Sequence, residues 1–124
     1  MFALVGVLPK LQLIWHMTEW IWWPAFQAIK QGVEDGHYFS IAPSLVRDPS
    51  QQQVARSVPL DRLVLESDAP ALGPVRGQRN SPLNLLQTVQ YLAELLNCSA
   101  EELAEITTQN ALRLFPKLKN RVKL

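Results

Sequence analysis

The sequence predicts an α/β fold with parallel strands, and three observations support this prediction. Two short stretches, 37–42 and 63–65, have the composition of buried strands. Segments with helical periodicity precede, separate and follow them, in the order helix, strand, helix, strand, helix, helix. Such alternation is typical of parallel βαβ units joined by right-handed crossovers. Two strands do not complete a sheet, because parallel strands are normally flanked by others, so the pattern looks like part of a larger architecture.

The first helix is predicted over residues 25–35. Pro24 suits the first position of a helix, and Gly36 stands where a left-handed cap belongs. The apolar residues expected on one buried face of this helix are Phe26, Ile29 and Val33.

The strand over 37–42 follows this helix directly and is rich in residues that favour strands. Pro43 and Ser44 end it. A short helix is then predicted to continue to about Ser57, with Asp48 as its N-cap and Pro49 at its first position.

The second strand leads into the stretch around which the chain is organised. The apolar run 63–65 is followed at once by Glu66, Ser67 and Asp68, and the residues after them exclude regular structure. Those residues are Pro70, Gly73, Pro74 and Gly77. An apolar strand that ends in acidic residues is where parallel α/β proteins place ligands, although an aspartate that caps a turn explains the local pattern equally well.

Two helices close the pattern. The first is predicted from Ser81 to Leu96 and the second from Ser99 to Leu114, where Ser99 and Glu102 form a capping box. Pro116 ends the second helix, and the basic tail from Lys117 is expected to fray. The side chains expected to face the core are Leu85, Leu86, Val89, Leu92, Leu96, Leu103, Ile106, Ala111 and Leu114.

Composition excludes some classes of protein. Twelve basic against eleven acidic residues leave a net charge of +1, so no strong field favours nucleic acid or an anionic membrane. The single cysteine, Cys98, excludes an internal disulfide and fits a reducing compartment. The apolar start is too short for a membrane span and lacks a signal peptide's features. We expect a cytoplasmic protein without a membrane partner, and the nucleus remains open.

Several motifs, in order, resemble the C-terminal end of the TatD family of metal-dependent hydrolases, usually described as deoxyribonucleases. They are Gly-His-Tyr-Phe-Ser-Ile-Ala-Pro-Ser (36–44), Glu-Ser-Asp-Ala-Pro (66–70), Ala-Leu-Gly-Pro (71–74), Arg-Asn-Ser-Pro (79–82) and Thr-Thr-Gln-Asn-Ala-Leu-Arg-Leu-Phe (107–115). The phrasing is most similar to the eukaryotic TatD domain-containing type 3 branch, and the likeness covers roughly residues 28–118.

This resemblance implies a partial (β/α)8 barrel made of the last two strands with their helices. It implies that Asp68 is a metal ligand at the end of strand eight, with Glu66 as its acidic neighbour and with Arg79 and Asn80 supporting the loop and the next helix. A divalent cofactor (Zn, Mg or Mn) and a DNA substrate follow from the family. Asn110 and Arg113 match the last-helix motif, where packing and hydrogen bonding are expected.

The chain also departs from the family pattern. A (β/α)8 barrel typically has about 250 residues, and the histidines and the glutamate that should precede the matching region cannot be placed. Only His16 and His37 exist, and neither is expected to be a ligand. We therefore divide the chain into an unassigned tryptophan-rich segment (1–23), a TatD-like portion (24–118) and a basic tail (119–124).

Two functions remain open on this basis. The first is a fragment or truncated isoform of a TatD-like phosphodiester hydrolase, inactive alone because most metal ligands are absent. The alternative is a non-catalytic interaction protein that uses the tryptophan-rich segment and the open sheet edge, where an unpaired strand is adhesive. A third possibility, intermediate between these two, is that another chain supplies the missing strands and histidines.

Overall fold

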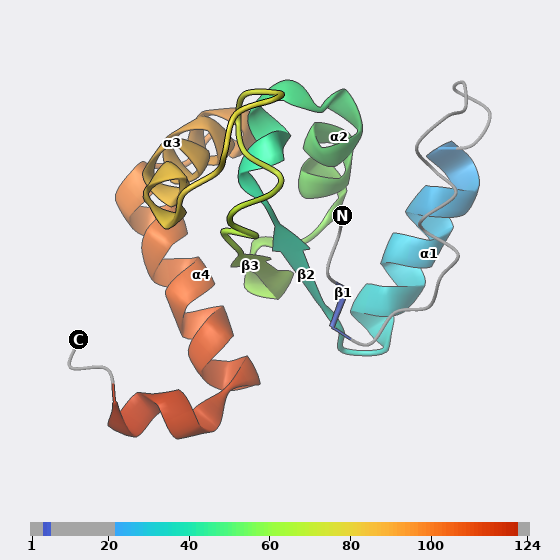
Figure 1. Cartoon of the computed structure of the whole chain (residues 1–124). Helices are drawn as coiled ribbons and strands as arrows, with labels where there is room; N and C mark the ends of the chain where they lie inside the picture. Colours follow the sequence, from blue (N-terminus) through green and yellow to red (C-terminus); the bar gives the residue numbers. More distant parts are fainter. Residues whose placement is uncertain (1–3, 6–21, 122–124) are drawn as a thin grey trace.

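A small sheet with strand order β1-β2-β3 lies at the centre of the fold (Figure 1). The computed structural model describes residues 4–5 and 22–121. Strands β2 (Tyr38–Ile41) and β3 (Leu63–Leu65) are parallel, with Phe39 opposite Leu63, which confirms the predicted parallel pair. Strand β1 (Leu4–Val5) pairs with β2 in the antiparallel direction, so this sheet is mixed rather than purely parallel.

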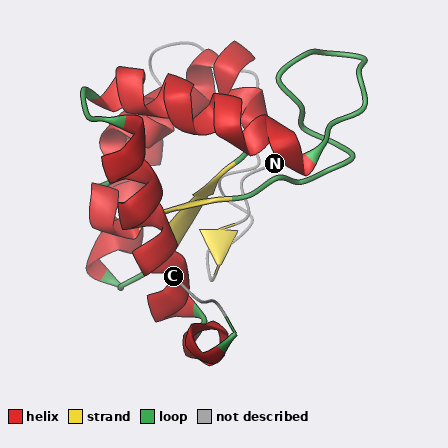
Figure 2. Ribbon diagram, turned by 90° about the vertical axis from the view of Figure 1, so that its left-hand side faces the viewer, coloured by secondary structure: helices red, strands yellow, loops and turns green. Residues whose placement is uncertain are grey.

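In the part of the chain that the structure describes, α-helices lie on two sides of the strands (Figure 2). They are α1 (Trp22–Glu34), α2 (Pro49–Ser57), α3 (Leu85–Leu96) and α4 (Ala100–Leu114). Short 3₁₀ helices cover Pro43–Arg47, Leu60–Arg62, Pro82–Asn84 and Pro116–Asn120. Among the described residues, no helix is both long enough and apolar enough to cross a bilayer.

The main core lies between the parallel strands and the helices that follow them. Phe39 and Ile41 of β2, Leu63 of β3, Leu92 of α3 and Leu103 of α4 are all almost fully buried. Because β2 and β3 are short, most of this core comes from helices packed against only a few strand residues. Because β2 and β3 are parallel, their carboxyl ends point to the same end of the molecule, where the loop 66–81 begins.

The predicted caps are confirmed. The Asp48 carboxylate accepts hydrogen bonds from the backbone N–H groups of Ser50 and Gln51, so it caps α2. Ser99 Oγ accepts a hydrogen bond of 3.0 Å from the Glu102 N–H at the start of α4. Gly36 has the left-handed φ of +80° that its position after α1 requires.

The predicted inner face of α1 was partly wrong. The helix begins at Trp22 rather than Pro24, and Phe26 is 46 % exposed, whereas Ala25 and Ile29 are buried. Ala25 and Ile29 are four residues apart and therefore share one face, while Phe26 is turned about 100° away from Ala25. Gly32 lies against β2, because a Cβ atom there would come within 3.0 Å of the Phe39 ring.

Two predictions for the C-terminal half were also wrong. Leu86 is 71 % exposed instead of facing the core, because Thr88, Leu92 and Ala93 form the buried face of α3. The tail from Lys117 is not simply frayed, since Pro116–Asn120 forms a 3₁₀ helix.

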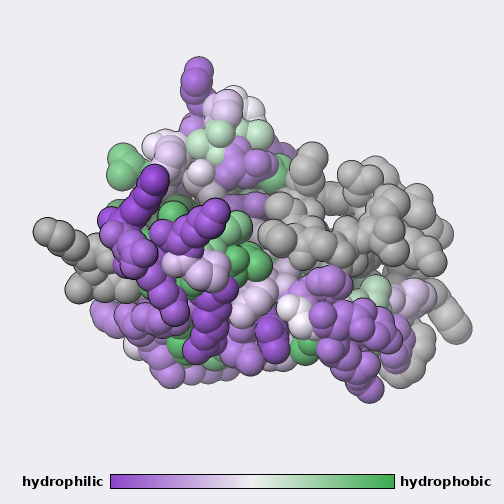
Figure 3. Space-filling view, turned by 90° about the horizontal axis from the view of Figure 1, so that it is seen from below, coloured by the Kyte–Doolittle hydropathy of each residue, from purple (hydrophilic) through white to green (hydrophobic). Residues whose placement is uncertain are grey.

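Seen from below, apolar surface lies among polar side chains (Figure 3). Phe115 and Leu118, near the end of the described chain, are among its exposed apolar residues.

Candidate functional site

Asp68 lies beyond the carboxyl end of β3, three residues after the strand ends at Leu65. Its side chain is exposed, and its backbone is left-handed with a φ of +46°. Aspartate tolerates this conformation better than most residues do, which fits a position where the chain must turn sharply. The turn closes through the Asp68 carbonyl oxygen, which accepts a hydrogen bond of 2.8 Å from the Ala71 N–H.

Glu66 is held differently from Asp68. Its backbone N–H donates a hydrogen bond of 3.0 Å to the Ile41 carbonyl, so the parallel ladder continues one residue past β3. Asp68 does not continue this ladder, because its φ of +46° takes the chain out of the extended conformation. The two carboxylates therefore do not have the common orientation of residues i and i+2 on a strand.

Asn80 is the centre of the hydrogen bonds within the loop, and its side chain is only 5 % exposed. Its Nδ2 donates to the carbonyl oxygens of Ser67 and Ala71, both at 2.6 Å. Its Oδ1 accepts hydrogen bonds of 2.8 Å from the Ser81 N–H and from Asn84 Nδ2. One amide therefore joins Ser67 and Ala71, which lie before and after Asp68 in the chain, to the start of the helical segment that follows the loop.

A contact from the neighbouring βα connection also fixes the loop. Arg47, in the 3₁₀ helix after β2, donates from Nε to the Gly73 carbonyl oxygen at 3.0 Å. Gly73 itself lies against Asn80, because a Cβ atom there would come within 3.1 Å of the Asn80 Cβ. The two connections that follow β2 and β3 are thus joined at the same end of the molecule.

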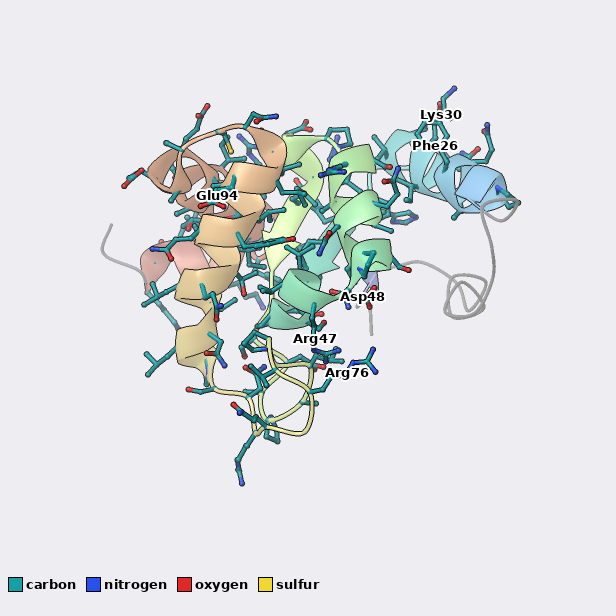
Figure 4. All side chains as sticks on the ribbon, turned by 90° about the horizontal axis from the view of Figure 1, so that it is seen from above. Phe26, Lys30, Arg47, Asp48, Arg76 and Glu94 are labelled. Carbon is teal, nitrogen blue, oxygen red and sulfur yellow. The ribbon has the colours of Figure 1, made fainter. Side chains whose placement is uncertain are left out.

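Arginine side chains surround this end. Arg79 lines a shallow pocket of about 460 Å³ together with Ala69, Pro70, Asn80, Ser81 and Pro82. Viewed from above, Arg47 and Arg76 lie at the end of the molecule where the loop is drawn (Figure 4). Guanidinium groups bind phosphate in a bidentate manner, so Arg79 makes this pocket suitable for an anionic group.

The donor set does not fit a complete divalent metal site. A catalytic zinc typically has about three protein ligands, and within residues 4–5 and 22–121 no group of three or more His, Cys, Asp or Glu side chains could hold a metal. His37 precedes β2 and so lies at the amino ends of the strands, away from Asp68. His16 falls outside the described residues.

The last-helix motif has the structural role that was expected of it. Asn110 is fully buried, and its Nδ2 donates to the carbonyl oxygens of Leu60 and Leu63 at 2.8 and 2.7 Å. Arg113 donates to the Asn110 Oδ1 at 3.2 Å. Asn110 therefore attaches α4 to the beginning of β3, at the opposite end of the strand from Asp68.

Sequence reasoning missed Arg47 and Gly73. Their hydrogen bond joins residues 26 positions apart, and no local pattern indicates it. The only available signal was topological, because residues that follow adjacent parallel strands meet at one edge of the sheet.

Residues 9–116 match the family model described as TatD related DNase. The human deoxyribonuclease TATDN3 is 46 % identical over 90 residues, which are 73 % of this chain and 33 % of the relative. The metal-dependent hydrolase YcfH of Escherichia coli K12 is 42 % identical over 84 residues, 64 % of this chain and 32 % of the relative. The chain therefore spans about a third of the length of these curated relatives.

Solved structures give the same picture. The TatD homologue YJJV from Escherichia coli K12 matches with a TM-score of 0.66 and 27 % identity, over 73 % of this chain and 37 % of that one. A TatD family hydrolase from Entamoeba histolytica matches with a TM-score of 0.65, over 73 % of this chain and 39 % of that one. At 16 % identity, this second likeness concerns the fold alone.

Proposed function

Since the chain belongs to the TatD related DNase family, we propose that it forms the last two strands and the C-terminal helices of a metal-dependent phosphodiester hydrolase barrel. In this proposal the substrate is DNA, and Asp68 is one ligand of a divalent metal (Zn, Mg or Mn). The single observation that carries it is the position of Asp68, exposed at the carboxyl end of β3 on a loop that Asn80 fixes.

Each residue of the site has a distinct role in this proposal. Asp68 offers a carboxylate, an oxygen ligand that divalent cations accept. Glu66 is a second acidic group two residues earlier in the chain, while Asn80 keeps the loop in the conformation that presents Asp68. Arg79 lines the adjoining pocket, where its charge suits a phosphate of the substrate. A bound metal would activate water and stabilise charge that develops on the phosphate.

The 124-residue chain alone is inactive in this proposal, because Asp68 and Glu66 do not make a complete donor set. The remaining ligands have to come from outside residues 4–5 and 22–121. The alternative of a non-catalytic interaction protein depends largely on the tryptophan-rich segment, most of which lies outside the described residues, and no specific observation favours it.

The test is cleavage of a fluorescently labelled DNA oligonucleotide with added Mn²⁺ or Zn²⁺. We expect no turnover by the chain alone. We expect turnover after mixing with a fragment of human TATDN3 that lacks the 90 residues matched here, which brings the rest of the family sequence. Asp68→Asn should abolish that restored turnover, because it removes the anionic ligand at the site.

Asp61→Asn is the matched control, since Asp61 is an exposed aspartate that lies before β3 rather than after it. It should leave the restored turnover unchanged. Metal-dependent cleavage by the chain alone that disappears in Asp68→Ala would overturn the proposed incompleteness. Equal turnover of the mixture with Asp68 and with Asn at position 68 would overturn the proposed ligand.

A further inference from the structure

Ser81 lies at the end of the loop that follows β3, directly before the 3₁₀ helix Pro82–Asn84. No other serine or threonine in the 124-residue sequence is followed by proline. The backbone of Ser81 is extended, with a φ of −132° and a ψ of 148°, which is the region that a following proline favours. A partly exposed, extended serine before a proline has the form of the substrate segments that proline-directed protein kinases accept.

The hydroxyl of Ser81 is accessible. Arg79 before it and Pro82 and Leu83 after it are exposed, and Leu83 is 76 % exposed. The Ser81 Oγ accepts a long hydrogen bond of 3.4 Å from the Leu83 N–H, which holds the hydroxyl only loosely. An enzyme can therefore reach this oxygen without opening the buried core.

Ser81 shares a pocket with a cation. Arg79 and Ser81 stand on either side of the buried Asn80, and both line the shallow pocket of about 460 Å³. None of the residues that line it is acidic. A phosphoserine carries a charge of about −1.5 to −2 at pH 7, and a guanidinium donates to phosphate in a bidentate manner. The pocket therefore has the space and the charge to receive a phosphate on Ser81.

We propose that Ser81 is a phosphorylation site for a proline-directed kinase and that its phosphate occupies the pocket beside Arg79. In this reaction Ser81 Oγ attacks the γ-phosphorus of ATP, so that an Oγ–P bond forms and the bond from the γ-phosphorus to the β,γ-bridging oxygen breaks. ADP leaves, and the hydroxyl proton passes to a base of the kinase. A neutral hydroxyl thus becomes an anionic group.

The consequence for activity rests on the proposed function, in which Arg79 binds a phosphate of DNA. A phosphate on Ser81 competes for the same guanidinium and repels the DNA backbone. Ala69 and Pro70, which also line the pocket, follow Asp68 directly in the chain. Phosphorylation therefore lowers DNA cleavage by placing negative charge next to the turn that presents the proposed metal ligand.

The first experiment incubates the purified chain with a mitogen-activated protein kinase, ATP and Mg²⁺ and follows the product by mass spectrometry. We expect one phosphoryl group, located on Ser81 by fragmentation, and none in Ser81→Ala. Ser50 is an internal control, because it is also partly exposed but follows a proline instead of preceding one. It should stay unmodified.

Pro82→Ala is the sharper variant, because it keeps the serine and removes only the proline after it. It should slow phosphorylation by about tenfold or more, since a site that recognises one side chain typically discriminates by that much. Pro82 is exposed, so the variant should keep the wild-type melting temperature in circular dichroism. A slower reaction would then not reflect unfolding.

The second experiment locates the phosphate by nuclear magnetic resonance. Phosphorylation should shift the Arg79 Nε–H resonance downfield, because this group enters a charge-assisted hydrogen bond. The signal is assigned by its loss in Arg79→Lys. Arg76, exposed in the same loop but outside the pocket, is the control, and its resonance should not move.

The third experiment repeats the restored DNA cleavage with each chain before and after kinase treatment. Treatment should lower turnover by the wild-type chain severalfold, whereas Ser81→Ala should keep the turnover that it had before treatment. Unchanged turnover by the phosphorylated wild-type chain would overturn the effect on activity.

Two other results would overturn the site itself. One is an unmodified Ser81 under conditions that fully phosphorylate a Ser-Pro control peptide, and the other is an equal rate for Pro82→Ala. An Arg79 resonance that does not respond to phosphorylation would overturn the position of the phosphate. If no mixture cleaves DNA, the proposed function fails, while the first two experiments still decide whether Ser81 is modified and where its phosphate lies.

Discussion

The two ends of strand β3 have very different surroundings. At the amino end, Leu63 lies opposite Phe39, and both side chains are at most 1 % exposed. At the carboxyl end, Leu65 is partly exposed and lines a groove between α3 and α4, which is also lined by Leu86 with 71 % of its surface exposed. Both ends are apolar in sequence, so composition does not distinguish them. The comparison teaches that the described residues bury only one of two apolar surfaces that the sequence encodes.

Helix α3 extends this comparison, because it contributes residues both to the buried core and to the groove. Leu92 is completely buried in the core that is shared with β2 and α4, while Leu86 lies in the groove. The two leucines are six residues apart and therefore point to different faces of the helix. One leucine thus stabilises the described fold, and the other leaves most of its apolar surface exposed.

Leu92→Ala gives the largest expected effect and sharpens this comparison directly. We expect a loss of about 3 kcal/mol in the free energy of unfolding, because the truncation leaves a cavity in a closely packed core. Leu86→Ala should change it by less than about 0.5 kcal/mol, since the side chain is mostly exposed. Urea unfolding followed by circular dichroism measures both. Equal losses would show that the groove is closed in the isolated chain.

Asn110→Ala tests the attachment of α4 to the amino end of β3. It leaves the carbonyl oxygens of Leu60 and Leu63 without their side-chain donor, and we expect a loss of about 2 kcal/mol in unfolding free energy. The neighbouring Gln109→Ala removes only a hydrogen bond to Glu105 at the helix surface. This control should lose less than about 0.5 kcal/mol in the same urea titration. A loss no greater than that control's would contradict the anchoring role.

The reactivity of Cys98, in the turn between α3 and α4, gives the smallest expected effect. Burial, and secondly the nearby Glu102 carboxylate, raises the pKa of its thiol. At pH 8 less of it is therefore thiolate, and we expect iodoacetamide to alkylate it severalfold more slowly than a cysteine introduced as Leu86→Cys in a Cys98→Ser background. The rates are measured by mass spectrometry. A faster reaction at Cys98 would mean that the turn between α3 and α4 is open.

The raised pKa also fixes the sign of a pH effect on stability. The neutral thiol is favoured more in the folded than in the unfolded chain. Its contribution is therefore fully present below the unfolded pKa and is lost as the pH rises through the folded pKa. Cys98→Ser should remove this alkaline component from the pH dependence of unfolding.

The sequence by itself determined the features that depend on neighbouring residues. The caps at Asp48 and Ser99 and the strand at 63–65 were all predicted, because a cap or a short apolar run is complete within a few positions. The position of Asp68 shortly after a buried strand was also predicted, because it can be read from the place where the apolar run ends.

Only the tertiary structure decided which apolar face is buried and how the loop is held. Leu86 and Leu92 are equally apolar, and only packing against α4 and β3 separates the exposed one from the buried one. Asn80 joins residues 13 positions apart, and Arg47 reaches Gly73 across 26. Such contacts depend on where the chain returns in space, and local sequence chemistry does not specify that position.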